Sequence, residues 1–238
     1  MSTQKKHVNA PLVVIEGNVG AGKSTFLRLI GEQLNAQLVF EPNAQWQDVD
    51  GENLLEKFYE DSKRWAYSFQ TYVFITRVQT QQEAAKINTQ PLQILERSVY
   101  SDRFCFAKNS YEMGNLSSLE WKMYCKWFAW LVDTHVQKPI AFIYLRTSPE
   151  VCFKRLHKRN RFEEVNVTLD YLQRLDKKHE DWLIHGKEDL IKNIPVLVLD
   201  NNKDFESNEL IRDEHLCEIV TFFEKVLHFP AKTVLKQN

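Results

Sequence analysis

The sequence lacks the segments that mark membrane-spanning and secreted proteins. No apolar run approaches the length of a membrane span, and residues 1–7 contain no apolar signal-peptide core. About ten residues precede the first apolar run, which is too few for an organelle transit peptide. We therefore expect a cytoplasmic protein, rather than a mitochondrial one, that binds no membrane.

Internal repeats, low-complexity tracts and linkers are also missing. The length of 238 residues suits one α/β domain, and 43% hydrophobic residues are enough for a substantial core. We expect a single domain over residues 1–238, with frayed ends at residues 1–10 and 230–238.

Net charge and cysteine content are both low. The 31 basic and 32 acidic residues give a net charge of -1, so we expect no nucleic-acid partner but a small anionic ligand bound by a local basic cluster. The four cysteines have neither C-x-x-C spacing nor a histidine at metal-site spacing. We expect them to be buried apolar residues in a reducing compartment: Cys105, Cys125, Cys152 and Cys217.

The most specific motif is GNVGAGKS at residues 17–24, a complete G-x-x-x-x-G-K-[ST] phosphate loop. The apolar run 12–15 precedes it and a helix-like segment follows, which is the context that this loop requires. Its backbone N–H groups and the helix N-terminus favour an anion, while Lys23 reaches the outer phosphates and the Ser24 hydroxyl binds Mg²⁺. We expect a nucleoside triphosphate at Gly17, Asn18, Val19, Gly20, Ala21, Gly22, Lys23, Ser24 and Thr25.

Two further short strands end in charged residues. Residues 37–40 lead to Glu41 and Pro42, and the buried run that starts at Pro91 leads to Glu96 and Arg97. Ligands of open α/β sheets bind at the carboxyl ends of the strands, so these charges are aimed at the site. Glu96 is a candidate Mg²⁺ ligand, and Arg97 is a candidate phosphate contact.

Helical spacing of apolar residues predicts helices over residues 54–59 and 64–86. Most of their aromatic residues suit a core. Gln70 and Arg77 are polar exceptions, two turns apart on one face, that could point into a ligand pocket. Trp46 lies in a polar loop, where surface packing and a stacking platform are equally good interpretations.

The most basic stretch of the chain covers residues 154–164 and contains Arg155, Arg159 and Arg161. Cations favour a helix C-terminus, so a solvated helix end is one interpretation. Arginines at spacings of four and two that run into a loop also suit a lid that closes on transferring phosphates. We favour the arginine-rich lid.

Strands alternate with helices along the chain, and further strands are predicted at residues 141–145 and 195–200. This order predicts an α/β fold with a five-stranded parallel sheet and helices on both faces. Residues 202–205 are similar to the guanine-reading N-K-x-D pattern of GTPases, but Phe205 stands where that pattern has aspartate. We therefore discount GTPase specificity.

In this order, the motifs resemble the deoxynucleoside kinases, of the deoxyguanosine and deoxycytidine kinase type. The resemblance spans residues 13–223 and rests on the phosphate loop, Glu41 with Pro42 and Trp46, residues 64–72, residues 96–103, and the arginine segment that ends in Glu163 and Glu164. It implies a P-loop kinase fold, ATP and Mg²⁺, and transfer of the γ-phosphoryl group to the 5′-hydroxyl of a deoxynucleoside in nucleotide salvage. It also implies a homodimer, formed through the tryptophan-rich helix predicted at residues 117–131.

The same resemblance assigns catalytic roles. Glu41 is the base, and Arg97 orients the 5′-hydroxyl and the incoming phosphate. Charge on the transferring phosphoryl group is stabilised by Lys23, Arg159 and Arg161, with help from Arg155, while Ser24 and Glu96 hold Mg²⁺. Asp204 and Phe205 cover the adenine of ATP. Tyr59 and Glu164 bind the 3′-hydroxyl of the deoxynucleoside. The base pocket comprises Trp46, Leu55, Phe58, Phe69, Gln70, Val73, Arg77, Asp102 and Phe106.

Arg77 and Asp102 bear most on specificity. In the family this pair accompanies the deoxycytidine and purine kinases, whereas thymidine-preferring members lack it. An arginine beside an aspartate can donate to a ring nitrogen or carbonyl and accept from an amino group. We therefore expect deoxyguanosine, deoxyadenosine or deoxycytidine as substrate rather than thymidine. Phe58 and Val73 depart from the deoxycytidine enzyme, so the balance between purine and pyrimidine stays open.

Three alternatives compete with this interpretation. A nucleoside monophosphate kinase would need an extra acceptor-side cation, and Glu41 would repel the phosphate of its acceptor. A non-catalytic structural relative would lose the phosphate loop or the acids, but Lys23, Glu41, Glu96 and Arg97 are all intact. A regulatory NTPase would show a switch segment, and none is recognisable. The kinase interpretation is preferred.

Overall fold

The computed structural model describes residues 10–230, 233 and 235–236. The frayed ends predicted from the sequence therefore lie largely outside the described residues. Near the C-terminus, the Lys236 N–H donates to the Gln33 carbonyl at 2.9 Å. No helix in the described part of the chain combines the length and apolar character needed to cross a bilayer.

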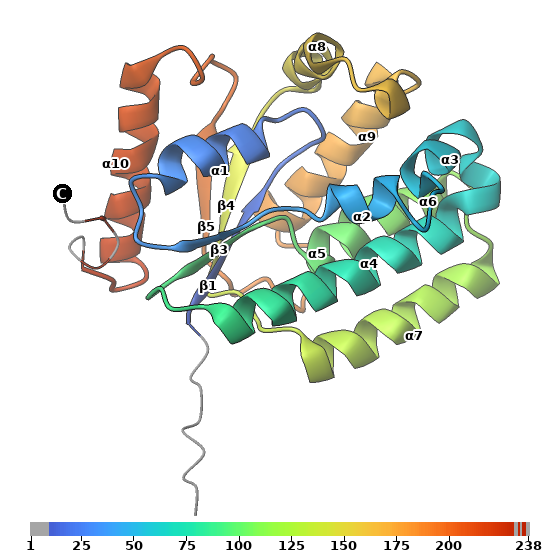
Figure 1. Ribbon diagram of the computed structural model, residues 1–238, viewed down its shortest axis with the longest axis horizontal. Helices are drawn as coiled ribbons and strands as arrows, with labels where there is room; N and C mark the ends of the chain where they lie inside the picture. The colour runs from blue at the N-terminus through green and yellow to red at the C-terminus, as the bar shows by residue number, and fades with distance from the viewer. Residues whose placement is uncertain (1–9, 231–232, 234, 237–238) are drawn as a thin grey trace, which may run out of the picture.

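A five-stranded, all-parallel sheet forms the centre of the fold (Figure 1). Its strands are β1 (Leu12–Glu16), β2 (Gln37–Val39), β3 (Gln93–Glu96), β4 (Ala141–Arg146) and β5 (Val196–Asp200). The spatial order β2-β3-β1-β4-β5 sets β3 beside β1, with Ile15 opposite Glu96. The loops that follow β1 and β3 therefore meet at one edge of the sheet, which is where the sequence placed the site.

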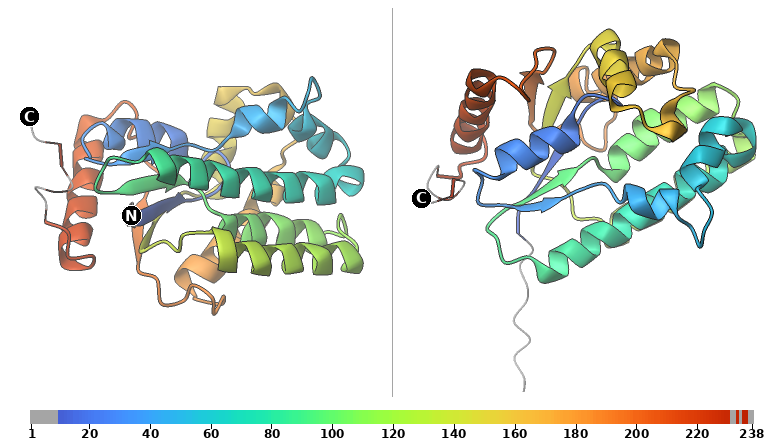
Figure 2. Two further views of the ribbon diagram at one scale, coloured as in Figure 1. Left: turned by 60° about the horizontal axis from the view of Figure 1, so that its bottom comes forward. Right: turned by 45° about the horizontal axis from the view of Figure 1, so that its top comes forward.

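Helices cover both faces of the sheet, as predicted. The α-helices are α1 (Lys23–Gly31), α2 (Asn43–Gln47), α3 (Leu54–Glu60), α4 (Ser62–Ile87), α5 (Val99–Ser101), α6 (Lys108–Glu112), α7 (Ser118–His135), α8 (Pro149–Arg159), α9 (Leu169–His179) and α10 (Glu209–Lys225). Figure 2 shows the two long helices α4 and α7 side by side.

Side chains of β1 point alternately to the two faces of the sheet, and each face is covered by a different set of helices. Val13 and Ile15 pack into the cluster that contains residues of α1 and α10, whereas Leu12 and Val14 pack against α4, α7 and α9. Successive strand residues face opposite sides of a sheet, so a strand covered on both faces is apolar throughout. All five residues of β1 are buried, including Glu16 at its carboxyl end.

The segment after β3 is not one regular α-helix. A three-residue α5 leads into a π-helix at Asp102–Ala107 and then into α6. A π-turn bonds residue i to residue i+5, so residues four to five apart share a face, and such turns often mark functional sites. Asp102 and Phe106 both line the cavity described below.

The four cysteines differ from one another in burial. Cys105 and Cys152 are buried as predicted, Cys125 is half-buried, and Cys217 is exposed on α10. The expectation that all four are buried was therefore wrong for Cys217, and Cys125 is only partly buried.

Candidate active site

A cavity of about 280 Å³ opens at the carboxyl ends of β1, β2 and β3. Most residues that the sequence singled out for the site line this cavity: Val19, Gly20, Gly22, Lys23, Ser24, Thr25, Glu41, Trp46, Leu55, Phe58, Tyr59, Phe69, Gln70, Val73, Arg77, Glu96, Arg97, Asp102, Phe106, Arg159, Arg161 and Glu164. Segments far apart in the sequence thus converge on one concave surface, which is the usual form of a ligand site.

The phosphate loop is shaped by glycines with positive φ. Gly20 has φ 79°, and a Cβ there would lie 2.4 Å from the Cys152 carbonyl oxygen. Gly22, at φ 88°, is the N-cap of α1 and offers no side-chain cap to the first N–H groups of the helix. Those N–H groups remain available to a phosphate.

Lys23 is buried at the floor of the loop. Its Nζ donates to the carbonyls of Gly17 at 3.2 Å and Asn18 at 2.8 Å. Burial and the nearby Arg97 lower the pKa of Lys23 to about 8, against the pull of Glu41 and Glu96. The ammonium is therefore poorly solvated and suited to an anionic partner.

The two candidate metal ligands lie in contact. The Ser24 hydroxyl donates to Glu96 Oε1 at 2.6 Å. Mg²⁺ is commonly bound by one or two protein oxygens together with waters and substrate phosphates, so this pair fits the ion. No group of three or more acidic, histidine or cysteine residues suited to a metal occurs among the described residues, and a phosphate-bridged Mg²⁺ does not need one.

Four charged residues form a buried network at the other end of the cavity. Arg77 donates to Asp102 and to Glu41, both at 2.8 Å, and Arg97 Nε lies 3.3 Å from the same Glu41 oxygen. Burial alone would raise the pKa of Glu41, but Arg97 and Arg77 outweigh it and hold the pKa below its usual value. Glu41 is therefore ionised at neutral pH.

Aromatic side chains form the walls beside this network. Phe58 and Phe69 stack with ring centroids 4.5 Å apart, and Trp46 meets Phe69 edge-on. Trp46 is buried, and its indole N–H donates to the Thr76 hydroxyl at 2.9 Å. Opposite, the Arg97 guanidinium lies 4.7 Å from the centre of the Phe106 ring. Flat apolar walls with a few polar groups suit a planar heterocycle.

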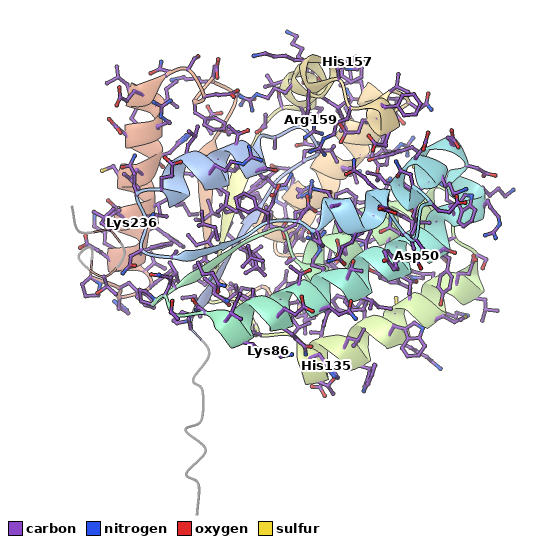
Figure 3. All side chains as sticks on the ribbon, viewed as in Figure 1. Asp50, Lys86, His135, His157, Arg159 and Lys236 are labelled. Carbon is purple, nitrogen blue, oxygen red and sulfur yellow. The ribbon has the colours of Figure 1, made fainter. Side chains whose placement is uncertain are left out.

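The arginine segment closes the cavity from α8. Arg159, the last residue of α8, donates to both oxygens of Glu164 at 2.6 and 2.7 Å, and Arg161 lies 3.8 Å from that carboxylate. Figure 3 shows Arg159 on the inner side of α8 and His157 on the outer side. The neighbouring Glu163 accepts a hydrogen bond of 2.6 Å from Gln47, at the end of α2.

Six predicted residues lie outside the cavity lining: Gly17, Asn18, Ala21, Arg155, Asp204 and Phe205. Arg155 donates to the carbonyls of Ala21 and Lys203, so it links the phosphate loop to residues 201–205. Phe205 is buried against Phe26.

Sequence reasoning missed Arg28, Asn43 and Tyr171, which also line the cavity. Tyr171 lies on α9 and follows the apolar spacing of Leu172 and Leu175, so nothing in the sequence separates it from the core. Glu16 was missed as well: it is fully buried directly before the phosphate loop and accepts a 2.6 Å hydrogen bond from Ser98.

Comparison with known proteins assigns this architecture to a family. Residues 13–224 match the deoxynucleoside kinase family model. The chain is 40% identical to deoxycytidine kinase 2 of Gallus gallus, with 89% of each chain covered, and 36% identical to the mitochondrial deoxyguanosine kinase of Xenopus laevis, again over 89% of each. It is also 36% identical to the deoxycytidine kinase of Homo sapiens, over 90% of this chain and 91% of that protein. The chain therefore belongs to the deoxynucleoside kinase family and is an ATP-dependent phosphotransferase that acts on deoxynucleosides.

Proposed function

We propose that this enzyme phosphorylates the 5′-hydroxyl of deoxycytidine, deoxyguanosine or deoxyadenosine in preference to thymidine. The observation that carries the proposal is the buried pair of Arg77 and Asp102 at 2.8 Å in the cavity wall. Arg77 offers donors and Asp102 offers acceptors to a base edge that carries an amino group beside a ring nitrogen. The relatives named as deoxycytidine and deoxyguanosine kinases agree with this preference.

In the proposed mechanism Glu41 takes the proton of the 5′-hydroxyl as that oxygen attacks the γ-phosphorus. The bond between the γ-phosphorus and the β,γ-bridging oxygen breaks, and ADP leaves. Arg77 and Arg97 keep the Glu41 carboxylate ionised and fix its orientation. A general base of this kind must lie within hydrogen-bond reach of the hydroxyl. Arg97 lies beside Glu41 and is placed to orient both the hydroxyl and the incoming phosphoryl group.

Cations hold the donor in this proposal. Lys23 and the N–H groups of the phosphate loop bind the outer phosphates of ATP. Arg159 and Arg161 stabilise the negative charge on the phosphoryl group that is transferred. Ser24 and Glu96 would hold Mg²⁺, which supplies charge neutralisation between the phosphates when it is bound. Tyr59 and Glu164 are proposed to bind the 3′-hydroxyl.

The charge balance of the acceptor end favours a nucleoside over a nucleotide as acceptor. Two arginines, Arg77 and Arg97, face two carboxylates, Glu41 and Asp102, and all four charges are engaged with one another. A nucleoside monophosphate would bring an anionic phosphate to the carboxylate of Glu41, whose two neighbouring arginines already bind carboxylates. This speaks against a nucleoside monophosphate kinase.

The proposal is tested by ADP release with ATP and Mg²⁺ against the four deoxynucleosides and their monophosphates. We expect turnover of deoxycytidine, deoxyguanosine or deoxyadenosine, weak turnover of thymidine and none of the monophosphates. Activity on monophosphates alone would contradict it.

Specificity has its own test in the paired substitution Arg77→Met and Asp102→Ala. Removing both charges leaves no unpaired buried ion at that position and opens space for the thymine methyl group. We expect thymidine phosphorylation to rise in this variant. An unchanged preference against thymidine would defeat the role given to the pair.

We further propose a homodimer assembled through α7. Trp127 and Trp130 are about half exposed on this helix, and Leu119 and Met123 extend the apolar face. Large exposed apolar side chains on one helix are typical of a protein interface. Sedimentation of the wild type and of Trp130→Lys tests the assembly, and a wild-type monomer would contradict it.

A further inference from the structure

Arg97 adopts a backbone conformation that is unusual for its residue type. Its φ is 62°, in the left-handed region, where the Cβ atom crowds the backbone. Three other non-glycine residues share a positive φ among the described residues, and all three are exposed: Asp50, Asn160 and His228. Buried strain of this kind persists only where the surroundings fix it, and it concentrates at functional sites.

Two contacts from β1 fix the turn that contains Arg97. The Arg97 N–H donates to the Ile15 carbonyl at 2.8 Å, and the hydroxyl of the next residue, Ser98, donates to Glu16 Oε1 at 2.6 Å. Glu16 is fully buried and directly precedes the phosphate loop. Arg97 and Ser98 are thus both hydrogen-bonded to the end of β1, directly before the phosphate loop.

Glu16 interacts electrostatically with cations that line the active-site cavity. The charged groups that act on it are Arg97 first, then Arg77 and Lys23, and all three of these cations line the cavity. Ser98 has a second task, since its hydroxyl also accepts the Tyr100 N–H at the start of α5. One serine therefore joins β1, the strained residue and the following helix.

We propose that Glu16 is a positioning residue: through the Ser98 hydroxyl it holds Arg97 in its left-handed conformation, with the guanidinium beside Glu41 and in register with the phosphate loop. This inference rests on the role proposed for Arg97. The link sets the distance between a group that binds the acceptor hydroxyl and the loop that binds the donor phosphates. Misplacement of such groups by about 1 Å can cost a hundredfold in rate.

The turn offers a matched set of variants. Ser98→Ala removes the hydrogen bond to Glu16, and Ser98→Thr restores a hydroxyl. Ser101→Ala is the control, because Ser101 forms the other half of the same capping box with Ser98. Glu16→Gln keeps an acceptor oxygen for Ser98 and removes only the charge.

We expect Ser98→Ala to lower kcat about tenfold or more while the KM for ATP stays within about threefold. Ser98→Thr and Glu16→Gln keep a hydrogen bond between the two residues and should retain most of the wild-type kcat. Ser101→Ala should have a kcat close to that of the wild type. In an Arg97→Ala background, Ser98→Ala should cause no further fall in kcat, because the link would have nothing left to position.

Three outcomes would overturn the inference: an unchanged kcat in Ser98→Ala, an equal loss in Ser101→Ala, or an undiminished effect of Ser98→Ala in the Arg97→Ala background. Arg97→Ala by itself separates this inference from the proposed function. Full activity in Arg97→Ala would remove the role of Arg97, and the inference with it. A large loss in Arg97→Ala beside normal Ser98→Ala would remove the role of Glu16 alone.

Discussion

The two ends of the cavity hold their arginines in different ways. At the acceptor end, Arg77 is 5% exposed and is paired with Asp102, which is 1% exposed. At the donor end, Arg159 and Arg161 are 36% and 37% exposed and share the single carboxylate of Glu164. The acceptor end is a buried, mutually neutralised network, whereas the arginine segment is solvated and has a surplus of positive charge.

This difference indicates which end is rigid. A buried ion pair is costly to break, because removing one partner leaves the other charge desolvated. The Arg159–Glu164 pair is exposed on the arginine side only, since Arg159 is 36% and Glu164 6% exposed. Water can solvate the guanidinium when it leaves, and Arg161 stays near the buried carboxylate at 3.8 Å. Under the proposed function, Arg159 can move from Glu164 to a phosphate more easily than Arg77 can leave its buried partners, so Arg77 stays in place to bind a base. We therefore expect the acceptor site to be formed before the donor binds.

The largest expected effect comes from the centre of the buried network. Glu41→Gln keeps the size and shape of the side chain but removes the proposed base, so we expect kcat to fall by about a thousandfold. The Kd of the nucleoside should change much less, and calorimetry on the variant measures it. Normal turnover would remove Glu41 from the role of base.

A second prediction contrasts the stability of the two ends. Asp102→Ala leaves the Arg77 guanidinium partly unpaired in a buried site, so the free energy of unfolding should fall by about 4 kcal/mol. Arg159→Ala removes a partly exposed arginine and leaves Arg161 near the buried Glu164 carboxylate, so it should cost less, about 2 kcal/mol. Urea unfolding of both variants measures this, and equal losses would contradict the comparison.

A third prediction concerns Glu16 and pH. Burial raises the pKa of Glu16 from 4.5 to about 7, against the opposing effect of Arg97. The folded state therefore binds a proton that the unfolded state releases, and the stability from this group is lost as the pH rises from about 4.5 to about 7. Glu16→Gln cannot titrate, so its stability relative to the wild type should increase by about 3 kcal/mol across that window. A constant difference between the two proteins at pH 4.5, 6 and 8 would contradict this.

The smallest expected effect lies where the two ends touch. Glu163 accepts hydrogen bonds from Gln47 at 2.6 Å and from Asn53 at 3.3 Å, which ties the arginine segment to α2 and α3. Glu163→Ala should raise the KM for the nucleoside by about two- to fivefold with little change in stability. Glu60→Ala, on exposed α3 surface, is the control. Equal KM values for both variants would show that the contact carries no coupling.

The sequence predicted the parts of the site that carry a local signal. The phosphate loop has a fixed pattern, and Glu41, Glu96 and Arg97 follow apolar strands whose carboxyl ends meet in a parallel sheet. The five-stranded sheet and its two helical layers were confirmed for the same reason, because apolar runs and helical spacing are local features.

Contacts between residues far apart in the chain could not be predicted from the sequence. The hydrogen bond from Arg77 to Glu41 joins residues 36 positions apart, and that from Ser98 to Glu16 joins residues 82 apart. No periodicity predicts either contact, because both depend on the order of the strands. The π-helix at Asp102–Ala107 was also missed, since its residues suit an α-helix equally well. Tyr171 was hidden among core residues of α9.

The most direct test of the comparison between the two ends is calorimetric binding of deoxycytidine and deoxyguanosine to the wild type without any nucleotide. A preformed acceptor site predicts that at least one of them binds, and that its Kd changes less than about tenfold when ADP and Mg²⁺ are added. Thymidine should bind more weakly under both conditions. Binding that appears only in the presence of ADP and Mg²⁺ would show that the donor end builds the acceptor site, and would contradict the account.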